Sequence, residues 1–304
     1  MAPTDHQQDR PPTGREQPKH PERADRPHPL DRPEQDGRPD RPGPRDDQRR
    51  VALVTGGTSG IGLAVVRLLA AQGHRVFLGA RTAEAVAATV GELRAEGLAV
   101  DGAEVDVRDP DAVRAFVARA VAAYGGVDIL VNNAGRSGGG VTADIADDLW
   151  HDVISTNLTS VFLVTREVLT TGGLRGRPWG RIVNIASTAG KQGVVLGAPY
   201  SASKHGVVGF TKALGNELAP TGITVNAVCP GYVETPMAQR VRAGYAQAWD
   251  VSEGDVLTRF QAKIPLGRYS TPQEVAGLVG YLVTDAAASV TSQALNVCGG
   301  LGNF

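Results

Sequence analysis

Cysteines, aromatic residues and net charge are all scarce in this chain of 304 residues. Its two cysteines, Cys229 and Cys298, lie far apart and outside any Cys-x-x-Cys pair, which excludes a disulfide framework and favours buried thiols in a reducing compartment. The 31 basic and 32 acidic side chains give a net charge of −1, so the basic excess of a general nucleic-acid binder is missing. We expect no nucleic-acid partner and no metal site.

Long apolar runs are missing as well. The start of the chain has no apolar segment of the kind that secretion signals contain. Residues 286–304 form an uncharged stretch of membrane-spanning length, but they include hydroxyl and amide side chains that a bilayer would leave unsatisfied. We therefore expect a soluble, cytoplasmic protein without membrane contact.

The first 50 residues are almost free of hydrophobic side chains. They contain eleven of the nineteen prolines, eleven basic residues and eleven acidic residues, and Asp-Arg-Pro recurs four times. Such a segment cannot bury enough apolar surface to offset its ordering entropy. We predict a disordered Pro/Arg/Asp-rich arm at 1–50, with a docking segment as the alternative, and a folded domain at 51–304, where the hydrophobic fraction rises to about 48%.

Beyond residue 50, short apolar runs alternate with segments of helical periodicity. The predicted buried strands are 51–55, 75–80, 103–107, 129–131, 181–186, 224–228 and 294–297. The predicted helices are 63–72, 83–96, 111–124, 147–170, 200–219 and 273–283. This alternation predicts an α/β fold: a single doubly wound Rossmann domain whose seven-stranded parallel sheet carries helices on both faces.

Residues 236–265 interrupt the alternation. Apolar and aromatic side chains gather there on a polar background, including Met237, Tyr245 and Trp249. The segment follows the sixth strand, near the carboxyl edge where doubly wound sheets bind ligands. It predicts a small helical flap over a substrate cleft, although an oligomer contact or ordinary packing explains the pattern equally well.

A glycine-rich loop joins the first strand to the first helix. Glycines in such a loop permit a tight turn and close approach of the backbone to a pyrophosphate, while the helix N-terminus offers free N–H groups to the anion. The placement directly after a buried strand makes a dinucleotide site the favoured interpretation. The expected cofactor contacts in this loop are Gly56, Thr58, Ser59, Gly60, Ile61 and Gly62.

The end of the second strand selects the cofactor. It offers Arg81 and Thr82 instead of the carboxylate that holds the ribose of NAD, so it favours the 2′-phosphate of NADPH or NADP+. Asp106 and Val107, at the end of the third strand, are expected at the adenine edge. Capping of the next helix is the alternative for Asp106, although Asp109 followed by proline is the better cap.

Catalytic chemistry is predicted from Tyr200 and Lys204, which lie four residues apart on one helix face. A nearby cation favours ionised tyrosine, so we expect a lowered tyrosine pKa and a better proton partner for a carbonyl oxygen. Asn157 lies in an apolar helix, where an unpartnered amide is costly, so a buried polar network is expected around it. Ser187 follows the fifth strand.

These motifs, together with Asn-Asn-Ala-Gly at 132–135 and Pro-Gly at 230–231, resemble the short-chain dehydrogenase/reductase superfamily across residues 51–304. The resemblance implies that Tyr200 is the general acid, Ser187 binds the carbonyl oxygen, Lys204 holds the nicotinamide ribose and lowers the tyrosine pKa, and Asn157 supports a water relay. It also implies cofactor contacts beyond the glycine loop. These are Asn133, Ala134, Gly135, Tyr200, Lys204, Pro230, Gly231, Val233 and Thr235.

Segments 133–140, 187–195 and 295–304 resemble the actinorhodin-type ketoreductases of type II aromatic polyketide synthesis. This resemblance implies a cytosolic homotetramer that uses NADPH to reduce one ketone, at C9, of a poly-β-ketone tethered to an acyl carrier protein in antibiotic biosynthesis. Ser137 replaces a proline of that family, which leaves product stereochemistry open. Two alternatives stay open: a 3-oxoacyl-[acyl-carrier-protein] reductase of fatty-acid synthesis, and a catalytically silent NADPH sensor.

Substrate and carrier contacts follow from the same resemblance. The expected substrate contacts are Ser137, Gly138, Gly139, Thr188, Gln192, Val194, Met237, Tyr245 and Trp249. Arg81, Arg108 and Arg136 follow carboxyl strand ends and correspond to a basic docking patch for the acidic carrier protein. Electrostatic steering of the carrier would follow, and loss of Arg136 is expected to weaken turnover of carrier-bound substrate only.

Overall fold

The computed structural model describes residues 49–302. The arm predicted at 1–50 therefore lies outside the described residues, except for Arg49 and Arg50. Within the described part of the chain, no helix is both long and apolar enough to cross a bilayer.

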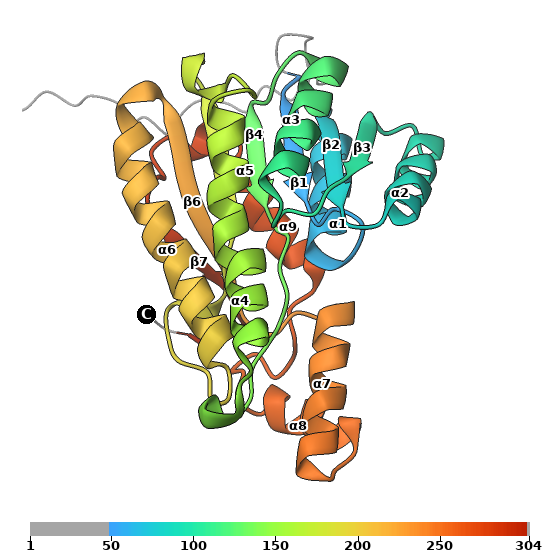
Figure 1. The fold of residues 1–304 in the computed structure, drawn as a ribbon, viewed down its shortest axis with the longest axis vertical. Coiled ribbons are helices and arrows are strands. Elements are labelled where there is room, and N and C mark those ends of the chain that lie inside the picture. The colour runs from blue at the N-terminus through green and yellow to red at the C-terminus, as the bar shows by residue number, and fades with distance from the viewer. Residues whose placement is uncertain (1–48, 303–304) are drawn as a thin grey trace, which may run out of the picture. The chain divides into compact units, whose positions relative to one another are not determined.

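Seven parallel strands form one sheet in the order β3-β2-β1-β4-β5-β6-β7, which confirms the predicted fold class (Figure 1). Their bounds are β1 (Val51–Thr55), β2 (Arg75–Ala80), β3 (Val100–Glu104), β4 (Ile129–Asn132), β5 (Gly180–Ile185), β6 (Ile223–Pro230) and β7 (Ala294–Val297). The order reverses between β1 and β4, so the loops after these two strands lie side by side at the carboxyl edge. That reversal is where doubly wound sheets bind ligands.

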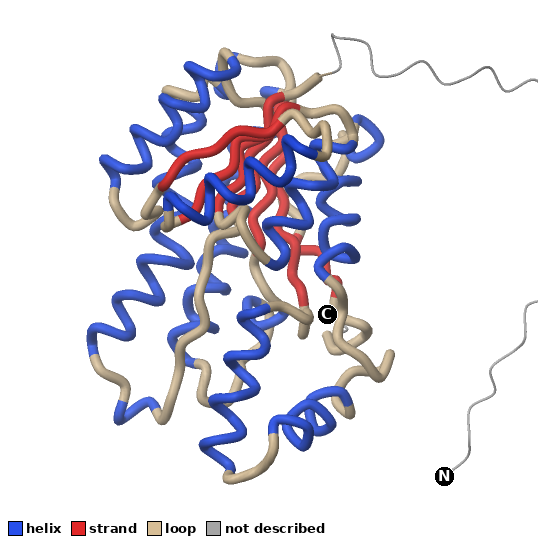
Figure 2. The backbone as a smooth tube through the Cα atoms, turned by 90° about the vertical axis from the view of Figure 1, so that its right-hand side faces the viewer, coloured by secondary structure: helices blue, strands red, loops and turns tan. Residues whose placement is uncertain are grey.

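Helices cover both faces of the sheet, as Figure 2 shows from the side. The bounds are α1 (Gly60–Ala71), α2 (Ala83–Ala95), α3 (Pro110–Tyr124), α4 (Asp147–Ile154), α5 (Ser160–Leu169), α6 (Ala198–Leu218), α7 (Pro236–Trp249), α8 (Glu253–Gln261) and α9 (Pro272–Leu282). A hydrophobic core lies on each face of the sheet, and successive side chains of β1 point into different cores. Val54 belongs to the core with α1, α2 and α9, and Leu53 belongs to the core with α3, α5 and α6. Burial on both faces explains why the central strands β1 and β4 are apolar along most of their length.

Two sequence predictions need correction. The third strand runs over Val100–Glu104 instead of 103–107, because Asp101 and Gly102 hide its beginning in the hydrophobic pattern, whereas Val105 and Val107 are buried just after it ends. The single helix predicted at 147–170 is divided. A π-helical turn at Ser155–Thr159 separates α4 from α5, and such turns are frequent at functional sites.

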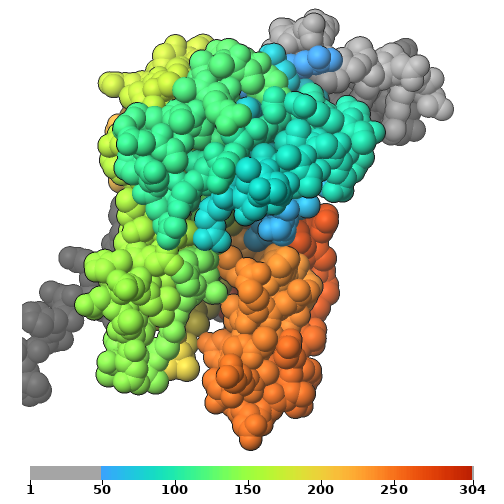
Figure 3. Space-filling model, turned by 45° about the vertical axis from the view of Figure 1, so that its right-hand side comes forward, coloured from blue at the N-terminus to red at the C-terminus, as the bar shows by residue number. Residues whose placement is uncertain are grey.

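The 236–265 segment is helical, as predicted, and forms α7 and α8. The two helices have their own small core, in which Val256, Phe260, Ile264 and Tyr269 are buried. Tyr232 stacks on Phe260 at 4.9 Å and on Tyr269 at 5.2 Å between ring centroids. Figure 3 shows a hollow between this pair, in orange, and the light-green segment that contains α4.

Candidate active site

The glycine loop after β1 has a geometry that only glycine permits at key positions. Gly56 has φ +65°, and a Cβ on Gly62 would lie 2.1 Å from the Gly56 carbonyl oxygen, so a side chain at residue 62 would force helix and loop apart. The first turn of α1 carries no acidic residue, and the Ser59 hydroxyl makes no capping hydrogen bond within the described chain. The N–H groups there are thus suited to a pyrophosphate.

Asn133, a predicted cofactor contact, holds this loop in shape. Its Nδ2 donates to the carbonyl oxygens of Thr55 and Gly56, both at 3.0 Å. Thr55 Oγ1 in return accepts from the backbone N–H groups of Asn133, at 3.0 Å, and Ala134, at 3.1 Å. Sequence reasoning missed Thr55, because a threonine at a strand end looks ordinary until the pairing of β1 with β4 is known.

The loop after β6 meets the glycine loop. The Thr235 methyl group lies 3.2 Å from the position of a Cβ on Gly60, and Thr235 Oγ1 also accepts from the backbone N–H of Ala238 to cap α7. Pro230 ends β6, Gly231 packs against Cys298, and Val233 is buried. Both cysteines are buried thiols, as expected. The structure therefore brings the predicted cofactor segments after β1, β4 and β6 together.

The residues expected at the adenosine end lie after β2 and β3. Arg81 and Thr82 are exposed, and no carboxylate ends β2. Asp106 does not cap α3; Asp109 does, accepting from the Asp111 backbone N–H at 2.8 Å. Hydrogen bonds from Arg108 hold the pKa of Asp106 below its usual range, and Arg81 adds to this effect. A cation without a competing carboxylate on β2 fits a 2′-phosphate.

Asn157 lies in the π-helical turn and is 1% exposed. Its Oδ1 accepts from the Arg136 backbone N–H at 2.8 Å, and its Nδ2 donates to the Arg136 carbonyl at 3.0 Å and to Ser203 Oγ at 3.1 Å. Ser203 Oγ donates to the Tyr200 carbonyl at 2.7 Å. The expected buried polar network is present, and it includes Ser203, to which the sequence assigned no role.

Tyr200, Ser187 and Lys204 meet beside this network. Lys204 Nζ donates to the Ile185 carbonyl at 2.8 Å and lies 5.8 Å from the Tyr200 ring centroid. Burial lowers the pKa of Lys204 to about 8. Burial also raises the pKa of Tyr200, while a hydrogen bond with Ser187 acts in the opposite direction.

The expectation of a lowered Tyr200 pKa is thus wrong for this structure, because desolvation disfavours the phenolate more than the neighbouring groups stabilise it. A phenol with a raised pKa is protonated at neutral pH. That state suits a proton donor in the direction of reduction.

The predicted substrate contacts lie in several segments, and one of these, the loop with Gly138 and Gly139, packs against α4. A Cβ on Gly138 would lie 2.4 Å from Val153 Cγ2, and one on Gly139 would lie 2.0 Å from the Leu196 carbonyl oxygen, so this loop packs closely against α4 and residues 194–197. Of the remaining predicted contacts, Thr188 is buried, Ser137, Gln192 and Met237 are half-buried, and Val194 is exposed. Tyr245 and Trp249 pack on each other and on Phe260 inside the α7–α8 pair.

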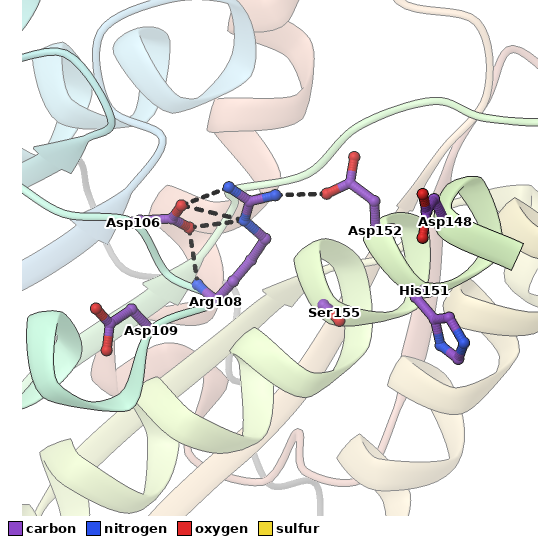
Figure 4. Close-up of a pocket in the computed structure, with 7 residues that line it drawn as sticks. All are labelled: Asp106, Arg108, Asp109, Asp148, His151, Asp152 and Ser155. Carbon is purple, nitrogen blue, oxygen red and sulfur yellow. Dashed lines mark hydrogen bonds and ion pairs between the residues drawn. The ribbon is translucent and has the colours of Figure 1, made fainter.

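Two of the three rim arginines are already paired with aspartates. Arg108 contacts Asp106 at 2.6 Å and Asp152 at 2.7 Å, beside a hollow of about 470 Å³ (Figure 4). Arg136 forms an ion pair with the other carboxylate oxygen of Asp152. Most of the positive charge expected for the docking patch is therefore compensated within the protein.

The short chain dehydrogenase family model matches residues 50–246, which span the glycine loop, the polar network and the Tyr200–Lys204 pair. This chain belongs to the short-chain dehydrogenase family. As a short-chain dehydrogenase it is an oxidoreductase that acts on a keto or hydroxyl group.

Several proteins similar to this dehydrogenase are named for polyketide synthesis. A ketoacyl reductase of the monensin polyketide synthase from Streptomyces virginiae is 77% identical over 255 residues, 84% of this chain and 98% of the relative. A granaticin polyketide synthase ketoacyl reductase from Streptomyces violaceoruber is 68% identical over 254 residues, 84% and 93% of the two chains. A solved variant of the actinorhodin polyketide ketoreductase with NADPH is 61% identical, with a TM-score of 0.82 over 84% of this chain and 98% of that one. The resemblance to polyketide ketoreductases is confirmed.

Proposed function

We propose that this short-chain dehydrogenase uses NADPH to reduce a ketone, at C9, of a carrier-bound poly-β-ketone in aromatic polyketide antibiotic biosynthesis. The observation that carries the proposal is the proximity of Asn157 and Lys204 to Gly135, in the segment whose Asn133 holds the glycine loop, and of Tyr200 to Ser187 and Lys204. The chain is also 77% identical to a polyketide synthase ketoacyl reductase. A cofactor sensor would need no proton donor at this position.

The chain's own groups perform the proton chemistry. Ser187 and Tyr200 hydrogen-bond the ketone oxygen, where negative charge develops during reduction. Tyr200 donates its phenolic proton to that oxygen, and its raised pKa keeps the proton available at neutral pH. Lys204 lies beside the Tyr200 ring, and the Asn157 network reaches the Tyr200 backbone through Ser203, so we assign the replacement of the proton to these groups. Bound NADPH supplies the hydride.

The fit to NADPH rests on the chain's residues at both ends of the site. The N-terminus of α1 receives the pyrophosphate, and Arg81 with Thr82 receives the 2′-phosphate. Arg81→Asp would exchange the cation for the carboxylate that suits NAD, so the ratio of kcat/KM for NADPH to that for NADH should fall. An unchanged ratio would contradict this assignment.

Little uncompensated positive charge is available on the rim to bind an acidic carrier protein. Arg81 is the rim arginine without an ion pair among the described residues, whereas Arg108 and Arg136 are paired with Asp106 and Asp152. We therefore expect modest steering of an acidic carrier protein. Raising the salt concentration should lower kcat/KM only slightly more for a carrier-bound ketone than for a free one.

Coexpression with a minimal polyketide synthase tests the whole proposal. The expected product carries a hydroxyl at C9, and its configuration reports the effect of Ser137 in the loop before α4. A product identical to that of the synthase alone, combined with reduction of acetoacetyl carrier protein, would favour the fatty-acid reductase instead. The homotetramer and the cytoplasmic location stay predictions; light scattering on the purified protein tests the first of them.

A further inference from the structure

A line of alternating charges runs from the end of β3 to the catalytic asparagine. Asp106 contacts Arg108, Arg108 contacts Asp152 on α4, and Asp152 contacts Arg136. Both backbone polar groups of Arg136 are hydrogen-bonded to the Asn157 side chain. We propose that Asp152 is a positioning residue that orients Asn157 through Arg136. The inference rests on the proposed ketone reduction.

The two arginines depend on Asp152 to different degrees. Arg108 is held by Asp106 through its Nε at 3.0 Å and its Nη2 at 2.6 Å, and only its Nη1 reaches Asp152. Arg136 has no other ion-pair partner within residues 49–302, and its Nε donates to the neighbouring Ser137 carbonyl. Loss of the Asp152 carboxylate should therefore release Arg136 and leave the β3 end in place.

Release of the Arg136 side chain reaches the buried Asn157 amide through the backbone of residue 136. Residue 136 supplies two of the three hydrogen-bond partners of Asn157, and the third, Ser203, joins Asn157 to the backbone of Tyr200. Small displacements of positioned catalytic groups reduce turnover strongly. We therefore expect Asp152 to affect the reduction step for a free ketone as well as for a ketone attached to a carrier protein.

The test compares Asp152→Ala with Asp148→Ala in the full chain. Asp148 lies one turn before Asp152 on α4 and lines the hollow beside Arg108 that Figure 4 shows. It makes no ion pair within the described chain, so it is a matched control. The assay is NADPH-dependent reduction of a free bicyclic ketone, trans-1-decalone. We expect Asp152→Ala to lower kcat roughly tenfold to a hundredfold. The NADPH dissociation constant should change by less than about twofold, because Asp106 retains Arg108, and Asp148→Ala should behave as the wild type.

Conservative variants separate positioning from general damage to α4. Asp152→Glu keeps the charge and should recover part of the lost kcat, whereas Asp152→Asn keeps the volume and should not. Because both ion pairs are partly exposed, the thermal midpoint should shift little in any variant. In the double variant Asp152→Ala/Arg136→Ala, kcat should fall no further than in the less active of the two single variants, since the ion pair between Asp152 and Arg136 is already lost in each of them.

Four results would overturn the inference. If the wild type is active and Asp152→Ala has the same kcat, the role of Asp152 is refuted while the proposed ketone reduction stands. A loss restricted to carrier-bound substrate would assign Arg136 and Asp152 to docking. Equal losses in Asp148→Ala and Asp152→Ala would assign the effect to the helix. An inactive wild type would refute the proposed ketone reduction and this inference together.

Discussion

The two walls of the hollow in Figure 3 are built differently. On the α4–α6 side, polar groups are buried and hydrogen-bonded, Gly138 lies against the Val153 side chain, and Gly139 lies against the Leu196 backbone. On the α7–α8 side, stacked aromatic rings form a small separate core, and burial raises the pKa of Tyr232 to about 12. One wall is therefore suited to proton chemistry, and the other supplies shape.

The largest expected effect is the loss of kcat when Tyr200, on the α4–α6 wall, is replaced by phenylalanine. The substitution removes the proton donor and keeps the ring, so kcat for trans-1-decalone should fall roughly 10²- to 10⁴-fold. NADPH binding, measured by fluorescence titration, should be retained. If NADPH consumption were unchanged, Tyr200 would not be the acid and the mechanism would be wrong.

Matched truncations compare the main core with the core of α7–α8. Phe116 is 1% exposed and Phe260 is 3% exposed. Phe116→Ala should lower the free energy of unfolding by about 3–5 kcal/mol. Phe260→Ala should lower it less and instead accelerate hydrogen exchange within residues 236–265, because that core is small and separate. Equal losses of global stability would show that the two cores unfold as one.

The buried Lys204 makes stability depend on pH. Its pKa of about 8 lies below the ordinary lysine value of 10.5, so the unfolded chain binds more protons between these two pH values. Its contribution to the free energy of unfolding therefore rises as the pH rises through this window, by at most about 3.4 kcal/mol. Lys204→Met removes this contribution, so the stability difference between variant and wild type should change across pH 8 to 10.5. A constant difference would contradict the lowered pKa.

Two glycine substitutions test the cofactor loop. A methyl group on Gly62 would collide with the Gly56 carbonyl, whereas one on Gly91 in α2 would have no atom within 4 Å. Gly62→Ala should cost about 1–3 kcal/mol of stability and weaken NADPH binding. Gly91→Ala should instead gain about 0.5–1 kcal/mol and bind NADPH normally. Equal NADPH affinities in the two variants would argue against a role of this loop in binding.

Deletion of residues 1–45 should have the smallest effect. Every candidate site residue lies at position 55 or later, so kcat and KM for ketone reduction should match those of the full chain. A loss of activity would place part of the site in the arm.

The sequence predicted what depends on local pattern. The glycine loop and the Tyr200–Lys204 pair each lie within a short stretch of sequence. The alternation of strands and helices is visible in the spacing of the apolar residues. The Thr55–Asn133 contact and the Asp152–Arg136 pair were not predicted, because their partners meet only through sheet order and helix placement. The direction of the Tyr200 pKa shift was predicted wrongly, since it depends on burial that no spacing reveals.

The scarcity of aromatic residues makes the two walls separately observable. The three tryptophans lie in different places: Trp150 on α4 beside Pro199, Trp179 bonded to Asp285 just before β5, and Trp249 at the end of α7. Trp249 is 37% exposed and contacts Tyr245 and Phe260. With Trp150 and Trp179 replaced by phenylalanine, Trp249 would be the remaining tryptophan. A change in its emission on addition of ligand would then report on the α7–α8 wall alone.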